Sequence, residues 1–434
     1  MGLTRRNLFK YAGAGAATVA FADVLAACGV VPGTSGGGGA AKGDLEIFSW
    51  WTAGGEADGL AEMFKIYNQK YPDVKIKNAA VAGGAGTNAK AVLATRMQGG
   101  QPPDSFQVHA GQELISTWVK ANKMDPITQI WKDENWDQTI PKDFKDIVSS
   151  NGEVWSVPVN VHRGNALWFN VKTLKDNNIT APTSFDEFFS AMDKLKGKVQ
   201  APLALGSKGN WQVTMLFENN IVAVGGADFY KGLFNGKSQW TDAKVTTALT
   251  NTKKMFDYIN SDHSTIDWDE ASGRVNKGTS AFTIMGDWAK GYFTSLNLKA
   301  NTDFGAAPSP GTKGTYMIVC DTFGLPKGAP NPDAAKGWIK VCGSQEGQAA
   351  FNPKKGSIPA RTDVSKSIFD PIAQQFIDEF KTSALTPSIA HGSAAPEAFA
   401  SALNDEMGSF VQKRDVAATQ ANIKKLADQY LAAK

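Results

Sequence analysis

The chain has 434 residues, of which 42% are hydrophobic and 20% charged, with a formal net charge of +3. A chain of this length exceeds what one hydrophobic core usually supports, so we expect two lobes. Residues 1–27 carry a net charge of +2 from Arg5, Arg6 and Lys10 against Asp23, which leaves +1 for the rest. This near-neutral balance argues against nucleic-acid binding.

The first 28 residues have the pattern of an export signal. Paired arginines within 4–10 precede an apolar, small-residue run at 11–27 that is too short to span a bilayer. The segment resembles a twin-arginine signal, which exports folded proteins. LAAC at 25–28 resembles a lipoprotein box, in which Cys28 is lipidated; an ordinary signal with a chance cysteine is the alternative. The Gly-rich residues 29–43 predict a flexible tether, which a lipid-anchored domain needs.

The chain that follows opens with a predicted strand at 45–49 that ends at Trp50 and Trp51. A Gly-bearing turn then leads to a helix from Glu56 to about residue 71. Ligands of open α/β sheets bind beyond the carboxyl ends of the strands. Side chains alternate along a strand, so one tryptophan packs inward and the other can face a ligand. Burial of both in the core is the alternative; we favour an aromatic ligand platform beside a carboxylate.

Two further strands lead into polar turns. The strand at 74–81 precedes the Gly-rich turn 82–90, which opens a helix to about residue 98. This turn lacks the Gly-Lys-Ser/Thr ending of a P-loop, but its backbone N–H groups can donate to a polar ligand. The strand at 105–109 places Gln107 and His109 on one face, and a helix to about residue 120 follows.

The middle of the chain contains a first predicted crossing between lobes. A short strand at 154–157 meets Pro158, which indicates an edge, a bulge or a crossover. A strand at 166–170 resumes the sheet, and residues 268–293 predict helix, strand, Gly turn and helix, with Asp287 and Trp288 at the strand end. The elements expected between them are a helix at 183–195, a strand at 201–206 and helices at 211–224, 228–233 and 242–259.

The last third crosses back and becomes helical. Strands are predicted at 317–320 and 323–325, a helix follows from about 331, and the loop 385–397 contains His391. For Cys320 and Cys342, a disulfide and two buried thiols are both open, and neither cysteine suggests a metal site. The alternation of strands and helices indicates an α/β architecture without internal repeats.

Several segments, taken in order, resemble a known family: SWW at 49–51, VPVN at 157–160, MGDWAKGYF at 285–293, AAPSPG at 306–311 and NPKKGSIPAR at 352–361. They resemble the sugar-binding proteins of ABC importers, the maltose-binding-protein-like class of extracellular solute-binding proteins. The chain is most similar to glucose/galactose-binding lipoproteins of thermophilic bacteria, from Leu45 to the C-terminus. The resemblance implies a two-lobed periplasmic-binding-protein fold (type II), each lobe a sheet flanked by helices and joined by hinge segments. It implies no catalysis and no cofactor.

The resemblance also implies a set of sugar contacts. Sugars present apolar C–H faces to aromatic rings, and hydroxyls that donate and accept. Three of the four histidines fall in the implied set; capping of buried carbonyls and a metal site are the alternatives, and the histidine spacing argues against metal. Trp211 aligns only loosely, and Arg163-Gly164 replaces a serine-like polar residue of the family. The matching positions are Trp50, Trp51, Glu56, Gln107, His109, His162, Asn165, Trp211, Asp287, Trp288, Asp321, Lys355 and His391.

The expected domains follow from the crossings predicted at 157–161, 304–308 and 343–348. We expect a signal at 1–28, a tether at 29–43, a first lobe at 44–157 plus 304–344 and a second lobe at 158–303 plus 345–434.

The expected function is that of an exported, monomeric binding protein, lipid-anchored to the outer face of the cytoplasmic membrane. It would bind a monosaccharide of the glucose/galactose type between the lobes and deliver it to an ABC permease. Mannose or a short oligosaccharide is the runner-up. A glycoside hydrolase with carboxylates from Glu56, Asp287 or Asp321, and a purely structural surface lipoprotein, are disfavoured alternatives.

Overall fold

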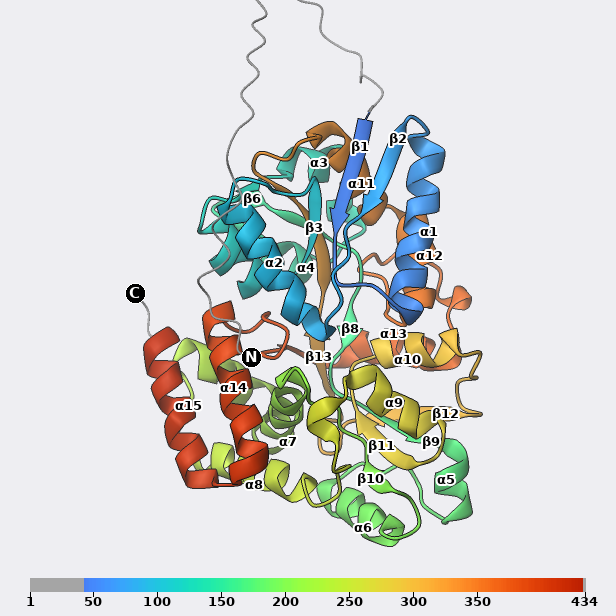
Figure 1. The fold of residues 1–434 in the computed structure, drawn as a ribbon, viewed down its shortest axis with the longest axis vertical. Coiled ribbons are helices and arrows are strands. Elements are labelled where there is room, and N and C mark those ends of the chain that lie inside the picture. The colour runs from blue at the N-terminus through green and yellow to red at the C-terminus, as the bar shows by residue number, and fades with distance from the viewer. Residues whose placement is uncertain (1–42, 432–434) are drawn as a thin grey trace, which may run out of the picture. The chain divides into compact units, whose positions relative to one another are not determined.

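Two helix-covered β-sheets organise the computed structural model, which describes residues 43–431 (Figure 1). The described residues belong to one compact unit, with the first sheet in the upper half of Figure 1 and the second in the lower half. We call the two halves the first and second lobes. The expected signal, the lipidated Cys28 and all of the tether except Gly43 lie outside the described residues.

The first sheet has the order β2-β1-β3-β14-β4, and β7 also pairs with β14. These strands are β1 (Gly43–Phe48), β2 (Val74–Asn78), β3 (Ser105–His109), β4 (Met124–Asp125), β7 (Ser156–Pro158) and β14 (Asp321–Pro326). β1 runs parallel to β2 and β3, whereas β14 is antiparallel to β3. Leu45 and Ile47 alternate along β1 and are fully buried, so an apolar run with a period of two forms a strand here. The carboxyl ends of β1 and β3 therefore meet at one edge of the sheet.

Helices cover this sheet on both faces (Figure 1). They are α1 (Gly54–Lys70), α2 (Thr87–Gln98), α3 (Thr128–Asp133), α4 (Lys142–Ile147), α11 (Pro332–Gly343) and α12 (Gln345–Lys355). We expected residues 345–355 in the second lobe, but α12 packs along α1 instead. Gly55 and Gly59 make this possible, because a Cβ on Gly55 would lie 2.2 Å from the Lys354 carbonyl and one on Gly59 2.9 Å from the Phe351 ring.

The second sheet has the order β10-β11-β9-β12. It consists of β9 (Ala166–Asn170), β10 (Ala201–Leu203), β11 (Ser280–Ile284) and β12 (Phe304–Pro308), with α5 (Val171–Asp176), α6 (Phe185–Leu195), α9 (Trp268–Asn276) and α10 (Trp288–Ser295) around it. We expected residues 304–344 to lie entirely in the first lobe. That boundary is wrong, because β12 pairs with β9 in antiparallel register from Phe304 opposite Asn170 to Pro308 opposite Ala166.

A small third sheet, β15-β13-β8, lies between the two lobes. Its strands are β8 (His162–Arg163), β13 (Thr315–Val319) and β15 (Ala384–Pro387). The chain passes from β7 of the first sheet to β8, and it returns from β13 to β14 through Cys320 alone. β15 occupies the start of the predicted loop 385–397, because its backbone pairs in parallel with β13.

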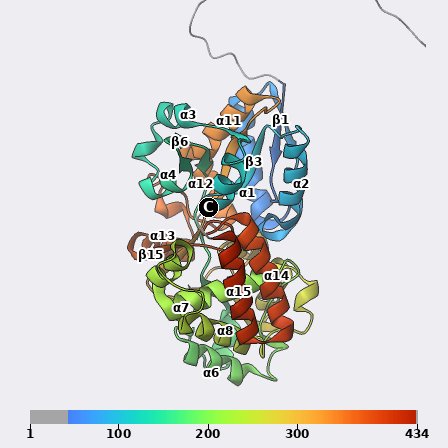
Figure 2. The same ribbon diagram turned by 90° about the vertical axis from the view of Figure 1, so that its left-hand side faces the viewer.

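Four helices complete the second lobe: α7 (Trp211–Asn235), α8 (Ala243–Met255), α14 (Glu397–Lys413) and α15 (Val416–Tyr430). Figure 2 shows α14 and α15 at the front, beside α7 and α8. Gly226 has a φ of 78° and breaks α7, between the two helices expected there. The remaining elements are the helix α13 (Pro371–Thr382) and the short β5 (Ser149–Ser150), β6 (Glu153–Val154), η1 (Gly84–Gly86), η2 (Glu113–Val119), η3 (Trp136–Gln138), η4 (His263–Thr265) and η5 (Lys366–Ile368).

The two cysteines within the described residues are not bonded to each other. Cys320 and Cys342 are buried free thiols, and burial raises the pKa of both well above the usual value. Within residues 43–431, none of the helices has the length and apolar character needed to cross a bilayer.

Candidate functional site

A cavity lies where strand ends of the first lobe meet loops of the second, and side chains from both lobes line it. The lining residues are Trp50, Glu56, Gly84, Ala85, His109, His162, Trp211, Trp268, Trp288, Val319, Asp321, Lys355 and His391. Nine of them belong to the set implied by the sequence. The wall thus combines indole rings with hydrogen-bonding groups, as in sites for small polar ligands.

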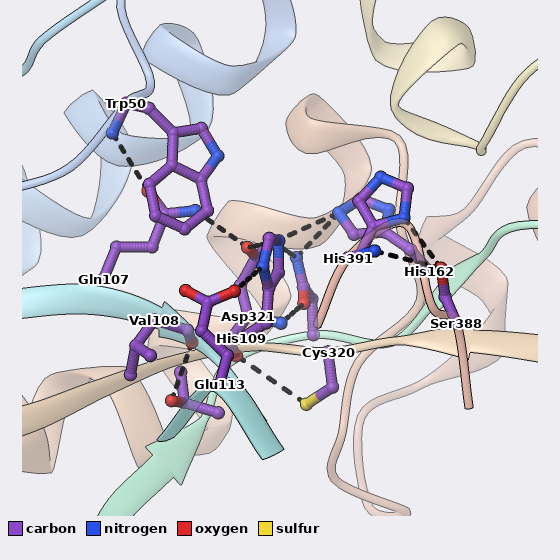
Figure 3. A network of polar contacts seen from close by, with 12 residues as sticks. Trp50, Gln107, Val108, His109, Glu113, His162, Cys320, Asp321, Ser388 and His391 are labelled. Carbon is purple, nitrogen blue, oxygen red and sulfur yellow. Dashed lines mark hydrogen bonds and ion pairs between the residues drawn. The ribbon is translucent and has the colours of Figure 1, made fainter. Parts of the chain in front are cut away.

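Trp50 follows β1, and a residue on the next strand fixes its place. The Gln107 side-chain oxygen accepts a 3.1 Å hydrogen bond from the Trp50 backbone N–H, and Gln107 Nε2 donates to Asp321 Oδ1 at 2.8 Å (Figure 3). The Trp50 ring lies 5.0 Å from the His109 ring. Gln107 is therefore a supporting residue behind the cavity wall.

Asp321, the first residue of β14, is the polar centre of the site. Its Oδ2 accepts a 2.8 Å hydrogen bond from Asn160 Nδ2 and lies 3.3 Å from His162 Nε2. Burial alone would raise the pKa of this carboxyl, but the hydrogen bond to His162 and the charges of Lys355 and the histidines outweigh it and hold the pKa far below its usual range. Asp321 is therefore a fixed acceptor.

His162 lies between two carboxylates. Its Nδ1 is hydrogen-bonded to Asp287 Oδ1, while Nε2 faces Asp321. Burial lowers the pKa of His162, but the Asp287 carboxylate outweighs that effect and raises it. Asp287 also accepts from the Arg163 backbone N–H at 3.1 Å. Asp287 thus orients His162 rather than facing the cavity itself.

His109 is held from behind by a chain of charges. Its Nδ1 lies 2.7 Å from Glu113 Oε2, and the same oxygen is 2.8 Å from Lys90 Nζ. Lys90 also contacts Glu397 Oε2 at 3.1 Å. Burial would raise the pKa of Glu113, but Lys90 and His109 outweigh it and lower the pKa. Because Glu397 begins α14, the chain of charges joins the two lobes.

The second lobe supplies an aromatic cluster around His391. The His391 ring lies 5.0 Å from Trp288, 5.3 Å from Trp211 and 5.6 Å from His109. Burial and the neighbouring His109 and Lys90 lower the pKa of His391 well below its usual value, so the imidazole is neutral. The Trp211 Nε1–H is buried and finds no acceptor among residues 43–431, and it is therefore a free donor beside the cavity.

Glu56 and Lys355 close the remaining side. They come from the first turn of α1 and the end of α12, and their side chains form a 2.6 Å ion pair. Lys355 Nζ also lies 5.3 Å from the Trp51 ring centre. We expected Lys355 on the second lobe, but α12 carries it with the first.

Four residues of the implied set do not line the cavity: Trp51, Gln107, Asn165 and Asp287. Trp51 is fully buried between Phe323 and Phe351, because the alternation after β1 turns it away from Trp50. Asn165 donates to the Thr315 carbonyl at 2.8 Å and accepts from the Met317 N–H at 3.0 Å. It therefore stabilises the strand that joins the lobes.

Sequence reasoning missed three features near the cavity. Trp268 lines it at the start of α9, Asn160 supports Asp321, and Lys90 with Glu113 supports His109. Trp268 follows Asp267, whose side-chain oxygen accepts a hydrogen bond from the Trp268 backbone N–H and so caps α9. An aspartate directly before a helix is the one sequence feature that could have pointed to Trp268. Asn160 lay inside a quoted motif, whereas nothing local marks Lys90.

A second cavity adjoins the first and shares Trp50, Glu56, Gly84, Trp268 and Trp288 with it. Its other lining residues include Asp267, Asp269, Glu270 and Tyr292. The three histidines converge, but residues 43–431 contain no group of three or more His, Cys, Asp or Glu side chains arranged to hold a metal ion.

The family model for bacterial extracellular solute-binding proteins matches residues 42–349, which is well over half of the chain. The chain belongs to this family. Its members bind solutes, and the chain is a binding protein rather than an enzyme. The expected two-lobed α/β fold is confirmed: a bacterial solute receptor described as exclusively preferring β-D-galactopyranose has a TM-score of 0.79 at 17% identity, over 89% of this chain and 99% of that one.

Three curated relatives extend this likeness. An uncharacterised ABC transporter extracellular-binding protein of Pyrococcus horikoshii is 44% identical over 86% of this chain and 85% of its own length. A probable sugar-binding periplasmic protein of Mesorhizobium japonicum is 32% identical over 85% and 89%. A glucose-binding protein of Saccharolobus solfataricus is 26% identical over 71% and 59%.

Proposed function

We propose that this solute-binding protein captures a monosaccharide of the glucose/galactose type in the cavity between its lobes and delivers it to an ABC permease. The observation that carries the proposal is the composition of the cavity wall. Indoles from both lobes, Trp50 and Trp288 among them, can cover the apolar C–H faces of a pyranose. Asp321, His391 and the free Trp211 N–H supply acceptors and a donor for its hydroxyls.

The names of the relatives support the same ligand class. The Mesorhizobium relative is described as sugar-binding and the Saccharolobus relative as glucose-binding, and the Pyrococcus relative belongs to an ABC transporter. Delivery to a permease requires that the transporter distinguish loaded from empty protein. A cavity with walls from two lobes makes the loaded and empty proteins differ in conformation, because a ligand that touches both lobes binds the closed state better than the open one.

A calorimetric screen across aldoses, disaccharides and maltodextrins tests the proposal. We expect saturable binding of D-glucose or D-galactose with no product formed. Tight binding of an oligosaccharide without monosaccharide binding would overturn the choice of ligand. The adjoining cavity, which shares tryptophans with the first, favours a short oligosaccharide as the second candidate, with mannose as another runner-up.

We also propose that the protein is exported and works as a monomer tethered through lipidated Cys28 to the outer face of the cytoplasmic membrane. The lipoprotein-like sequence and the Gly-rich stretch after it support this. Cys28→Ser should move the protein from the membrane fraction to the soluble exported fraction. Unchanged membrane association of the variant would contradict the anchor.

A further inference from the structure

Glu218 is a fully buried carboxylate in the middle of α7. Its Oε2 accepts from the backbone N–H groups of Ile389 at 2.6 Å and Ala390 at 3.3 Å, and its Oε1 accepts from Ser388 Oγ at 2.8 Å. The Tyr230 hydroxyl lies 3.2 Å from Oε2. A buried carboxylate is costly unless hydrogen bonds compensate it, and nearly all of these bonds come from one short segment, 388–390.

That segment carries a residue of the cavity wall. Ser388 Oγ lies 2.9 Å from His391 Nδ1 and 3.3 Å from the His391 backbone N–H (Figure 3). The Gly392 N–H donates back to the Ile389 carbonyl at 2.9 Å, which makes the segment a tight turn. Glu218 therefore reaches the cavity through two intermediaries, Ser388 and His391.

Proton counting fixes the direction of these hydrogen bonds. A serine hydroxyl has a single proton, and Ser388 gives it to the ionised Glu218. Ser388 Oγ can then only accept from His391, so the proton of the neutral imidazole resides on Nδ1. His391 Nε2 carries a lone pair, and no hydrogen bond from residues 43–431 occupies it.

We infer that Glu218 is a positioning residue for the ligand site: through Ser388 it sets the His391 tautomer, so that Nε2 accepts a hydrogen bond from a ligand hydroxyl. The assignment of the tautomer does not depend on the proposed function. Only the expected change in sugar affinity rests on the proposed function. Burial raises the pKa of Glu218 to about 7, so the ionised form that this arrangement needs prevails at pH 8.

Glu218→Gln tests the inference with almost no change in shape. The amide oxygen has to face Ile389 and Ala390, because their N–H groups can only donate. The amide NH₂ then faces Ser388, which must accept from it and give its own proton to His391 Nδ1. The substitution should therefore move the imidazole proton of His391 to Nε2 and turn the acceptor in the cavity into a donor.

The readout is ¹⁵N NMR of the imidazole nitrogens at pH 8 without sugar, which is tractable because the chain has 4 histidines. We expect Nδ1–H for His391 in the parent and Nε2–H in Glu218→Gln. Tyr230→Phe is the positional control: it removes a hydroxyl that lies 3.2 Å from the other carboxylate oxygen and 2.8 Å from the Pro387 carbonyl oxygen, and it should leave the tautomer unchanged. An Nε2–H tautomer in the parent, or the same tautomer in parent and Glu218→Gln, would overturn the inference.

Calorimetry with D-glucose and D-galactose then measures the consequence for binding. We expect Glu218→Gln to lower the affinity for the sugar roughly 3- to 10-fold, the scale of one hydrogen bond. In a Ser388→Ala background the same substitution should have no further effect, because the path to His391 is already cut. An equal loss in both backgrounds would contradict the path. If neither sugar binds the parent, the proposed ligand fails and the NMR comparison still decides the tautomer.

Discussion

Trp50 and Trp51 are adjacent in the chain, and their rings serve different surroundings: Trp50 contacts His109 in the cavity wall, whereas Trp51 packs against Phe323 and Phe351 in the core. The two rings therefore give a matched pair for separating binding from stability. Trp50→Ala should weaken sugar binding by ~1–3 kcal/mol, the usual scale for a buried aromatic contact. Trp51→Ala should lower the free energy of unfolding by roughly 3–5 kcal/mol.

Calorimetry and urea denaturation on both variants check this pair. Trp288→Ala, from the second lobe, should behave like Trp50→Ala. Parental affinity in folded Trp50→Ala and Trp288→Ala would remove the stacking role from the proposal.

The ion pair of Lys90 with Glu397 should help to hold the lobes together. Lys90→Gln removes the cation from Glu113 and Glu397 alike, so the closed state should weaken and sugar affinity should drop by ~1 kcal/mol, about 5-fold. Raising the salt concentration should reduce the affinity of the parent more than that of the variant. Lys65→Gln is the control, because Lys65 is exposed and pairs with Glu62 within α1. Equal salt dependence in parent and Lys90→Gln would exclude this role.

Stability should depend on pH through Glu218. Its pKa is raised from the usual 4.5 to about 7 by burial, so the folded protein binds a proton that the unfolded chain has released. The stability contributed by this group is fully present below about pH 4.5 and is lost as the pH rises through about 7.

Urea denaturation from pH 5 to pH 8 measures this contribution. The amide of the Glu218→Gln variant cannot titrate, so the free energy of unfolding of the parent minus that of the variant should fall over this range by on the order of 2–3 kcal/mol. Glu346→Gln, at a side chain 55% exposed, should show no such trend. A flat difference for Glu218→Gln would mean that the carboxyl titrates at the same pH in both states.

Sugar binding should make the protein more compact. The cavity wall combines groups of the first lobe, such as Trp50 and Asp321, with Trp288 and His391 of the second. Because such a ligand stabilises the closed state, the radius of gyration from small-angle X-ray scattering should decrease on adding sugar. An unchanged radius would point to a pre-closed cleft or a site on one lobe.

Many of the strands and turns could be predicted, because each is determined by residues that are neighbours in the chain. The strand ending at Trp50, the strand ending at His109 and the turn before Trp288 each show an apolar strand pattern followed by a Gly-bearing turn. The nine implied residues that line the cavity came from the resemblance to sugar-binding proteins, and this local pattern accounts only for those beside strand ends, such as Trp50 and His109.

What could not be predicted depends on pairing between distant segments. Nothing near Phe304 indicates that β12 joins β9 rather than the first sheet. The place of α12 depends on Gly55 and Gly59, which lie far away in the chain on α1. Glu218 lies in an ordinary helical stretch, and its role appears only when residues 388–391 are brought against it.

Gly111 has a φ of +97°, and a Cβ built on it would lie 2.6 Å from the carbonyl oxygen of Ser393 and 2.9 Å from its Cα. The first lobe thus meets the segment next to His391 backbone to backbone, with no room for even a methyl group. One carbon atom at position 111 would act as a wedge, and the left-handed backbone would disfavour it further. Gly111→Ala should therefore give a binding protein whose two lobes cannot close fully. Such a variant would still be able to contact a transporter, but it would not reach the closed conformation of the ligand-bound protein.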